Sequence, residues 1–120
     1  QIDKKKYAVE YAKKWNINIV LKGAKTVIAG PDKLVQVSSF INSAMAKGGT
    51  GDMLTGLISG LIASDKLNIL SKNNFFYKSC LGVYIQGFAA NIAKEELGET
   101  AVKSSDIIER LGLFHKKYFQ

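Results

Sequence analysis

The chain has 120 residues, and its 17 Lys and Arg against 10 Asp and Glu give a formal net charge of +7. Its length fits one domain, and a hydrophobic share of 47% excludes a disordered tail. With 11 Gly and one Pro, it is neither collagen-like nor a proline-rich linker. We therefore expect one globular unit.

Cysteine and histidine usage narrows the possible chemistry. Cys80 and His115 are the only residues of their kinds, so they provide neither an intramolecular disulfide nor a four-ligand zinc site. This favours a reducing, cytoplasmic setting and no protein-bound metal. The most apolar window, residues 53–63, is shorter than the ~20 residues of a membrane span, so no membrane partner is expected.

The first predicted element is a helix over residues 2–15, where apolar side chains recur at helical spacing and lysines occupy the rest of the surface. The apolar set is Ala8, Tyr11, Ala12 and Trp15. Residues 18–21, 26–29 and 34–37 follow, each short and rich in β-branched side chains. Gly, Pro and Asp between them predict three strands, the last two joined as a hairpin.

Three helices are predicted after the strands. The first covers residues 53–62, where Gly56 and Gly60 leave a bare stripe that allows close packing. The second covers about 73–97, and the third opens near residue 105 with Ser104 or Ser105 as its N-cap. Three strands are few for so much helical surface, so either this is a small α+β domain or part of the sheet lies outside the chain.

The most informative segment is a glycine-rich loop, residues 47–51, that runs directly into a helix. Glycines allow successive backbone N–H groups to turn toward one point, and the helix start adds unpaired N–H groups and a positive dipole end. This predicts an anion-binding site. The P-loop and dinucleotide-binding spacings are both absent, since Leu54 stands where the latter needs its third glycine.

Asp52 immediately follows the loop, where a carboxylate beside a phosphate site is electrostatically unfavourable unless it has a function. One interpretation is a general base that takes a proton from a substrate hydroxyl during phosphoryl transfer. The other is an acidic residue in the first turn of a helix, which the helix dipole favours. The pattern alone leaves both open.

Two linked motifs resemble the ADP/ATP-dependent NAD(P)H-hydrate dehydratases of the ribokinase-like superfamily. One is Lys-Gly-Ala-x-Thr-Val-Ile after a strand, and the other is Asn-x-x-Met-Ala-x-Gly-Gly-Thr-Gly-Asp-x-Leu-x-Gly. The matching positions are Lys22, Gly23, Ala24, Thr26, Asn42, Met45, Ala46, Gly48, Gly49, Thr50, Gly51, Asp52, Leu54 and Gly56. The resemblance implies the C-terminal part of a three-layer α/β/α fold, with all 120 residues in a single segment of that domain.

The resemblance also implies a reaction: ADP-dependent removal of water from (S)-NAD(P)H-hydrate, with release of AMP and phosphate. ADP or ATP would be the nucleotide, accompanied by Mg²⁺. The nucleotide contacts would come from Lys22, Gly23, Ala24, Lys25, Thr26 and Gly51, and the transferred phosphoryl group would lie on Gly48, Gly49, Thr50 and Gly51. Asp52 would be the base, with Asn42 beside it in the hydrate site.

Some features depart from the family pattern. Gln86 stands where many members have a histidine, Asn91 replaces an acidic residue, and a whole member is roughly twice this long. We expect activity to need the rest of such a domain. A homo-oligomer and a fused or separate NAD(P)H-hydrate epimerase are further expectations that the resemblance implies.

Two alternatives have a different chemistry. A thiazole or hydroxymethylpyrimidine kinase of the same superfamily would leave a stable phosphorylated product, but the form of the glycine motif argues against it. A basic nucleotide- or nucleic-acid-binding module would explain the charge. Against it, the lysines are scattered and Arg110 is the only arginine, so we expect no nucleic-acid partner.

Overall fold

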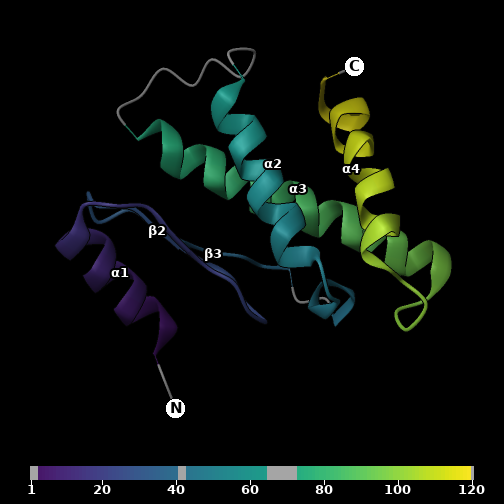
Figure 1. Ribbon diagram of the computed structural model, residues 1–120, viewed down its shortest axis with the longest axis horizontal. Helices are drawn as coiled ribbons and strands as arrows, with labels where there is room; N and C mark the ends of the chain where they lie inside the picture. The colour runs from purple at the N-terminus through teal and green to yellow at the C-terminus, as the bar shows by residue number, and fades with distance from the viewer. Residues whose placement is uncertain (1–2, 41–42, 65–72, 120) are drawn as a thin grey trace.

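The computed structural model describes residues 3–40, 43–64 and 73–119. Its elements are α1 (Lys4–Trp15), β1 (Ile19–Leu21), β2 (Val27–Ala29), β3 (Val35–Val37), the 3-10 helix η1 (Ser43–Ala46), α2 (Thr50–Ala63), α3 (Asn74–Leu97) and α4 (Ser104–Phe119) (Figure 1). The predicted order of one helix, three strands and three helices is confirmed. The short helix η1, just before the glycine-rich loop, was not predicted.

Helix α1 begins after Asp3, whose carboxylate accepts a hydrogen bond from the Lys6 N–H, and it ends at Asn16 in the left-handed conformation. Ala8 and Ala12 are buried against the sheet. Because alanine is small, the helix lies close to the strands at these two positions. The prediction that Ala8 and Ala12 belong to the buried face of this helix is therefore confirmed.

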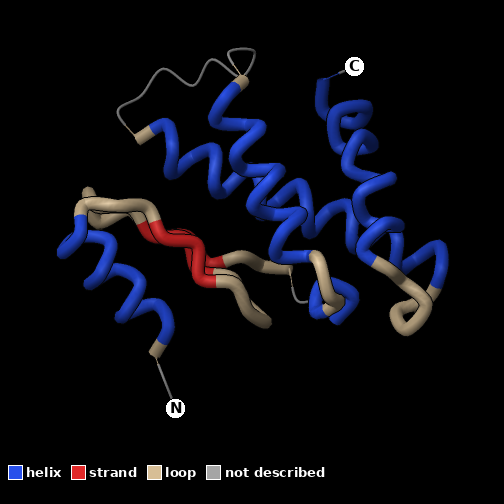
Figure 2. Tube along the Cα trace, viewed as in Figure 1, coloured by secondary structure: helices blue, strands red, loops and turns tan. Residues whose placement is uncertain are grey.

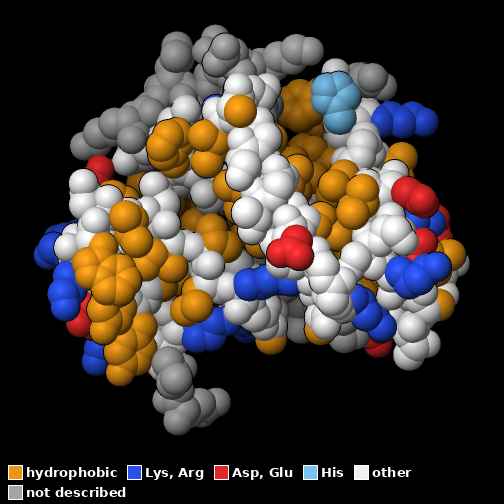
Figure 3. Space-filling model, viewed as in Figure 1, with side chains coloured by type: hydrophobic (Ala, Val, Ile, Leu, Met, Phe, Trp, Pro, Cys, Tyr) orange, Lys and Arg blue, Asp and Glu red, His pale blue; other side chains and the backbone are white. Residues whose placement is uncertain are grey.

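The aromatic residues of α1 do not belong to that buried face. The Tyr7 and Tyr11 rings stack with centroids 6.4 Å apart, and the Trp15 ring lies tilted against Tyr11 at 4.7 Å. Trp15 is 58% exposed. The prediction that Trp15 packs inward was therefore wrong. Figure 3 shows hydrophobic side chains gathered over α1 with basic side chains beside them.

The three strands form one antiparallel sheet in the order β1-β2-β3 (Figure 2). Val20 pairs with Ile28, and Ile28 pairs with Gln36. The predicted hairpin of the last two strands is confirmed, and Lys33 in its turn has a φ of 63°. The central strand β2 is buried along its whole length.

The sheet is the middle of three layers. Successive side chains of a strand point to opposite faces, so Val27 and Ala29 pack against α1 while Ile28 packs on the other side. There Ile28 joins Leu54 of α2 and Phe76 of α3. Figure 1 shows α1 across the sheet from α2 and α3. The expected α/β/α layering is therefore present within this chain.

Two glycines of α3 allow close contacts with neighbouring segments, but they are not the glycines that the sequence pattern indicated. A Cβ at Gly82 would lie 2.6 Å from the Ile58 side chain, and one at Gly87 would lie 2.4 Å from the Phe40 ring. A Cβ at Gly56 or Gly60 would meet nothing within 4 Å among the described residues. Close packing thus occurs on α3, and the glycine stripe of α2 is open.

Two helix ends are held by side chains. Lys78 of α3 is 4% exposed, and its Nζ donates hydrogen bonds to the carbonyls of Ile62 (3.2 Å) and Ser64 (3.4 Å) at the end of α2. At the start of α4, Asp106 accepts a hydrogen bond from the Lys103 N–H at 2.8 Å. The prediction that Ser104 or Ser105 is the N-cap was wrong, because α4 already begins at Ser104.

Helix α3 is 24 residues long, which is enough to cross a bilayer, but it includes charged residues and many small ones. Across the described ranges, no helix combines the length and the apolar character that a membrane span requires.

Candidate active site

The glycine-rich loop lies between η1 and α2. Gly49 precedes the first residue of α2 with a φ of 89°, a conformation that favours glycine. A side chain at this position would also come within 3.4 Å of Ser104 Oγ. Gly48 and Gly51 are exposed, with open space where a Cβ would be. The loop thus presents bare backbone, and the first N–H groups of α2 have no partner within the helix.

Thr50 is the residue that holds this loop together. Its side chain is 1% exposed, and its hydroxyl lies 2.7 Å from the Met45 carbonyl and 2.9 Å from the Lys47 carbonyl. Its backbone N–H also donates to the Lys47 carbonyl at 3.3 Å. These bonds close the loop on itself. Thr50 is therefore a structural residue of the glycine-rich loop, and its hydroxyl does not face solvent.

Lys22 reaches the same loop from the end of β1. Its Nζ donates hydrogen bonds to the Thr50 hydroxyl and, at 3.3 Å, to the Met45 carbonyl. Burial lowers the pKa of the Lys22 ammonium below its ordinary value, because the charged form loses water contacts. The structure thus brings together the two motifs that the sequence presents 28 residues apart.

The other predicted residues of the first motif lie farther along the chain, on the turn between β1 and β2. Gly23, Ala24 and Lys25 are exposed, and the Lys4 Nζ donates a hydrogen bond to the Lys25 carbonyl at 3.2 Å. Thr26 is buried at the start of β2, where its carbonyl accepts a hydrogen bond from the Ser38 N–H. Among the described residues, no hydrogen bond joins this turn to the glycine-rich loop.

Asp52 lies in the first turn of α2, exposed and directly after the loop glycines. A carboxylate there is free to meet a substrate that approaches the anion site from solvent. Asn42, the other residue predicted for the hydrate site, lies outside the described residues.

The structure adds two residues that the sequence analysis did not assign to the site. Gln86 of α3 is 2% exposed, and its Nε2 donates a hydrogen bond to the Thr50 carbonyl at 2.8 Å. Ser104 of α4 donates through its hydroxyl to the Gly48 carbonyl. The sequence signal for Gln86 was a glutamine within a mostly apolar stretch of α3, but the sequence analysis treated it only as a departure from the family pattern. Ser104 was assigned to a helix cap instead.

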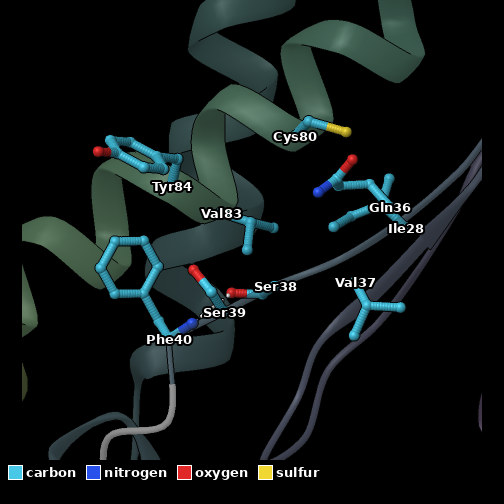
Figure 4. Close-up of a pocket in the computed structure, with 9 residues that line it drawn as sticks. All are labelled: Ile28, Gln36, Val37, Ser38, Ser39, Phe40, Cys80, Val83 and Tyr84. Carbon is cyan, nitrogen blue, oxygen red and sulfur yellow. Dashed lines mark hydrogen bonds between the residues drawn. The ribbon is translucent and has the colours of Figure 1, made fainter.

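Two cavities lie away from the loop. One of about 80 Å³ lies between the sheet and α3, where Ile28 and Gln36 face Cys80 and Tyr84 (Figure 4). The other, of about 430 Å³, is lined by apolar side chains of α2, α3 and α4, including Leu57, Leu81 and Phe114. Neither is lined by the loop glycines, and within the described ranges no three His, Cys, Asp or Glu side chains form a metal-binding group. Gly48, Gly49, Gly51 and Asp52 are exposed, so the predicted anion site lies at the surface of the part of the chain that the structure describes.

These features define a class: an α/β protein with an exposed glycine-rich loop at a helix N-terminus and one carboxylate beside it, an arrangement that suits phosphoryl-transfer enzymes. Comparison with known proteins identifies the family. The model of the NAD(P)H-hydrate dehydratase family matches residues 1–112, and the chain belongs to this family.

Individual relatives agree with this assignment. The chain is 35% identical over 111 residues to the bifunctional NAD(P)H-hydrate repair enzyme Nnr of Moorella thermoacetica, covering 92% of this chain and 20% of that protein. It is 36% identical over 83 residues to the ADP-dependent (S)-NAD(P)H-hydrate dehydratase of Neisseria meningitidis, and the match covers 69% of this chain and 26% of that protein. These relatives do not favour the kinase or nucleic-acid alternatives.

A solved structure matches as well. The ADP/ATP-dependent NAD(P)H-hydrate dehydratase of Bacillus subtilis, co-crystallized with ATP/Mg²⁺ and soaked with CoA, superposes with a TM-score of 0.81 at 32% identity. The match covers 96% of this chain and 40% of that one. The chain therefore spans well under half the length of these relatives.

Proposed function

We propose that the protein containing this chain repairs (S)-NAD(P)H-hydrate by ADP-dependent dehydration. The observation that carries the proposal is the position of Asp52, an exposed carboxylate in the first turn of α2 next to the bare amides of Gly48, Gly49 and Gly51. An anion site next to a base suits transfer of a phosphoryl group to a hydroxyl.

The proposed reaction has two steps. First, the hydrate hydroxyl attacks the β-phosphorus of ADP, Asp52 accepts the hydroxyl proton, and the bond to AMP breaks. Second, the C–O bond of the new phosphate ester breaks, the neighbouring carbon loses a proton, and NAD(P)H and inorganic phosphate result. Hydroxide is a poor leaving group and phosphate a good one, so the first step makes the second feasible.

Nucleotide binding is assigned to the same surface. Residues 48–51 would hold the transferred phosphoryl group through the N–H groups of the three glycines, since the Thr50 N–H donates to the Lys47 carbonyl. Lys22 would place a positive charge beside it. We assign the remaining nucleotide contacts to Gly23, Ala24, Lys25 and Thr26, and a hydrate contact to Asn42. Mg²⁺ would be bound mainly by the nucleotide phosphates, which suits a chain whose described residues offer no cluster of metal ligands.

The cellular context follows from the same proposal. A nucleotide-repair enzyme acts where NAD(P)H is used, and a single half-buried cysteine suits a reducing compartment, so we assign it to the cytoplasm. The open face around Asp52 would be completed by further residues of the domain. A homo-oligomer and an NAD(P)H-hydrate epimerase, fused or separate, are the proposed partners.

The direct test is recovery of NADH from purified (S)-NADHX by the protein at its full natural length, with ADP or ATP. We expect NADH, AMP and phosphate in equal amounts with ADP, and no NADH without a nucleotide. A stable phosphorylated hydrate would instead identify a kinase. No recovery with either nucleotide, from a protein that is folded by circular dichroism, would rule out the proposed function.

A further inference from the structure

Two peptide units of the glycine-rich loop are held through their carbonyl oxygens. The hydroxyl of Ser104 donates to the Gly48 carbonyl, and the Gln86 Nε2 donates to the Thr50 carbonyl at 2.8 Å. The donors come from α4 and α3, which are 56 and 36 residues away along the chain. Side chains from two separate helices thus donate hydrogen bonds to the same loop.

These carbonyls belong to the same peptide units as two loop amides. In a trans peptide the C=O and N–H point to opposite sides of the unit, so holding the Gly48 carbonyl sets the direction of the Gly49 N–H. Likewise, holding the Thr50 carbonyl sets the direction of the Gly51 N–H. A hydrogen bond to the carbonyl also polarises the N–H of its unit, which strengthens it as a donor to an anion.

The surroundings of Gln86 show how firmly its amide is placed. It is 2% exposed, and its Nε2 also lies 3.5 Å from the Met53 Sδ, so it contacts the first turn of α2 at two points. Nearby α3 positions Val83, Ala89 and Ala90 are buried apolar residues. A buried amide is costly without partners, so this glutamine has one favourable orientation, toward the Thr50 carbonyl.

Ser104 acts on the opposite end of the loop. Its Oγ would lie 3.4 Å from a Cβ at Gly49, so it packs directly behind the residue with the left-handed backbone. The hydroxyl therefore supports the one conformation in the loop that depends most on glycine.

We infer that Gln86 and Ser104 are positioning residues for phosphoryl transfer, because they aim the N–H groups of Gly51 and Gly49 at the transferred group. This inference rests on the proposed function and deepens it. Neither side chain touches the reacting atoms, since each acts on the carbonyl at the back of a peptide unit.

The test uses Gln86→Met, which keeps the volume but removes the donor, and Ser104→Ala, both in the protein at its full natural length. The aimed amides stabilise the transferred group most in the transition state. We therefore expect kcat to fall about tenfold for each variant while KM for ADP changes by less than about twofold. Gln86→His and Ser104→Thr, which restore an N–H or a hydroxyl, should recover most of the lost kcat.

Matched controls separate positioning from stability. Ser79→Ala removes a buried hydroxyl that bonds to the Phe75 carbonyl within α3, and Ser105→Ala removes the exposed serine next to Ser104. Both should leave kcat and KM unchanged. If Gln86→Met and Ser104→Ala lower the melting temperature but leave kcat intact, the two residues are only structural and the inference is wrong.

A second readout does not depend on turnover. In the wild-type protein and the variants, the amide resonances of Gly49 and Gly51 can be compared by NMR with no nucleotide present. We expect Ser104→Ala to shift the Gly49 amide and Gln86→Met to shift the Gly51 amide, with recovery in the rescue variants. Unchanged shifts would overturn the inference, whereas wild-type protein that fails to dehydrate NADHX would overturn the proposed function instead.

Discussion

Lys22, just after β1, donates a hydrogen bond through its ammonium group to the hydroxyl of Thr50, the first residue of α2. The same hydroxyl lies 2.7 Å from the Met45 carbonyl, which also accepts from Lys22. The strand that carries the first motif and the loop that forms the second are thereby joined. A substitution at either residue should therefore change what the other contributes to the free energy of unfolding.

The first prediction concerns this coupling. In a double-mutant cycle, Lys22→Met and Thr50→Val should each lower the free energy of unfolding, and the double variant should lose about 1 kcal/mol less than the sum. Denaturant unfolding of the full-length protein measures this. Lys25→Met, whose side chain lies on the exposed turn, should instead be additive with Thr50→Val. Additivity in both cycles would show that the contact contributes nothing.

The second prediction concerns the proposed base. Asp52→Asn should leave ADP affinity within about threefold, because it removes a charge without blocking the loop amides. The rate of NADH formation should fall by about 100-fold or more, because no carboxylate remains to take the hydroxyl proton. Calorimetric titration and the NADH assay measure the two quantities. Glu109→Gln, an exposed carboxylate on α4, is the control, and normal turnover by Asp52→Asn would exclude Asp52 as the base.

The third prediction concerns helix packing. Gly87→Ala should destabilise the protein by about 1–3 kcal/mol, because the new methyl group would lie 2.4 Å from the Phe40 ring. Gly112→Ala in α4 meets nothing within 4 Å among the described residues and should stabilise by about 0.5–1 kcal/mol through helix propensity. Equal effects of the two substitutions on the unfolding midpoint would contradict the close approach at Gly87.

The fourth prediction concerns Cys80, on the wall of the small cavity in Figure 4. Burial raises the pKa of its thiol from 9.0 to about 11. Well below pH 9 the thiol is mostly neutral in both the folded and the unfolded chain. Between pH 9 and 11 the unfolded chain releases this proton and the folded one keeps it, so the free energy of unfolding should fall with pH. We expect a fall of about 1 kcal/mol, because the thiol is only half-buried and water screens part of the effect.

The Cys80→Ala variant isolates this effect. Its free energy of unfolding should lack the part of the decrease at alkaline pH that the thiol causes. Denaturant titrations of both proteins from pH 8 to about 11 measure the difference. The same shift predicts that the native thiol reacts with a disulfide reagent at pH 8 about 100-fold more slowly than the unfolded one, because little thiolate is present. Parallel alkaline slopes for the two proteins would refute the raised pKa.

Most of the elements were predictable because they leave a local signal, whereas the short 3-10 helix η1 was not. Strands 19–21, 27–29 and 35–37 lie within the three β-branched runs, and α3 ends at Leu97 before Gly98 as its pattern indicates. The glycine-rich loop and Asp52 were found for the same reason: neighbouring residues determine backbone freedom and the helix start. Local patterns did not reveal that Trp15 is exposed, because a helix has two faces and only the sheet selects one.

The sequence by itself predicts the anion site, because the glycines at positions 48, 49 and 51 and the start of the following helix are local features that need no distant partner. Only the tertiary structure decided what holds that site. Lys22, Gln86 and Ser104 lie 28 to 56 residues from their partners in the loop, and no periodicity marks such contacts. They arise because the packing of β1, α3 and α4 around the loop brings three polar side chains to one place, where the buried loop groups require hydrogen-bond partners.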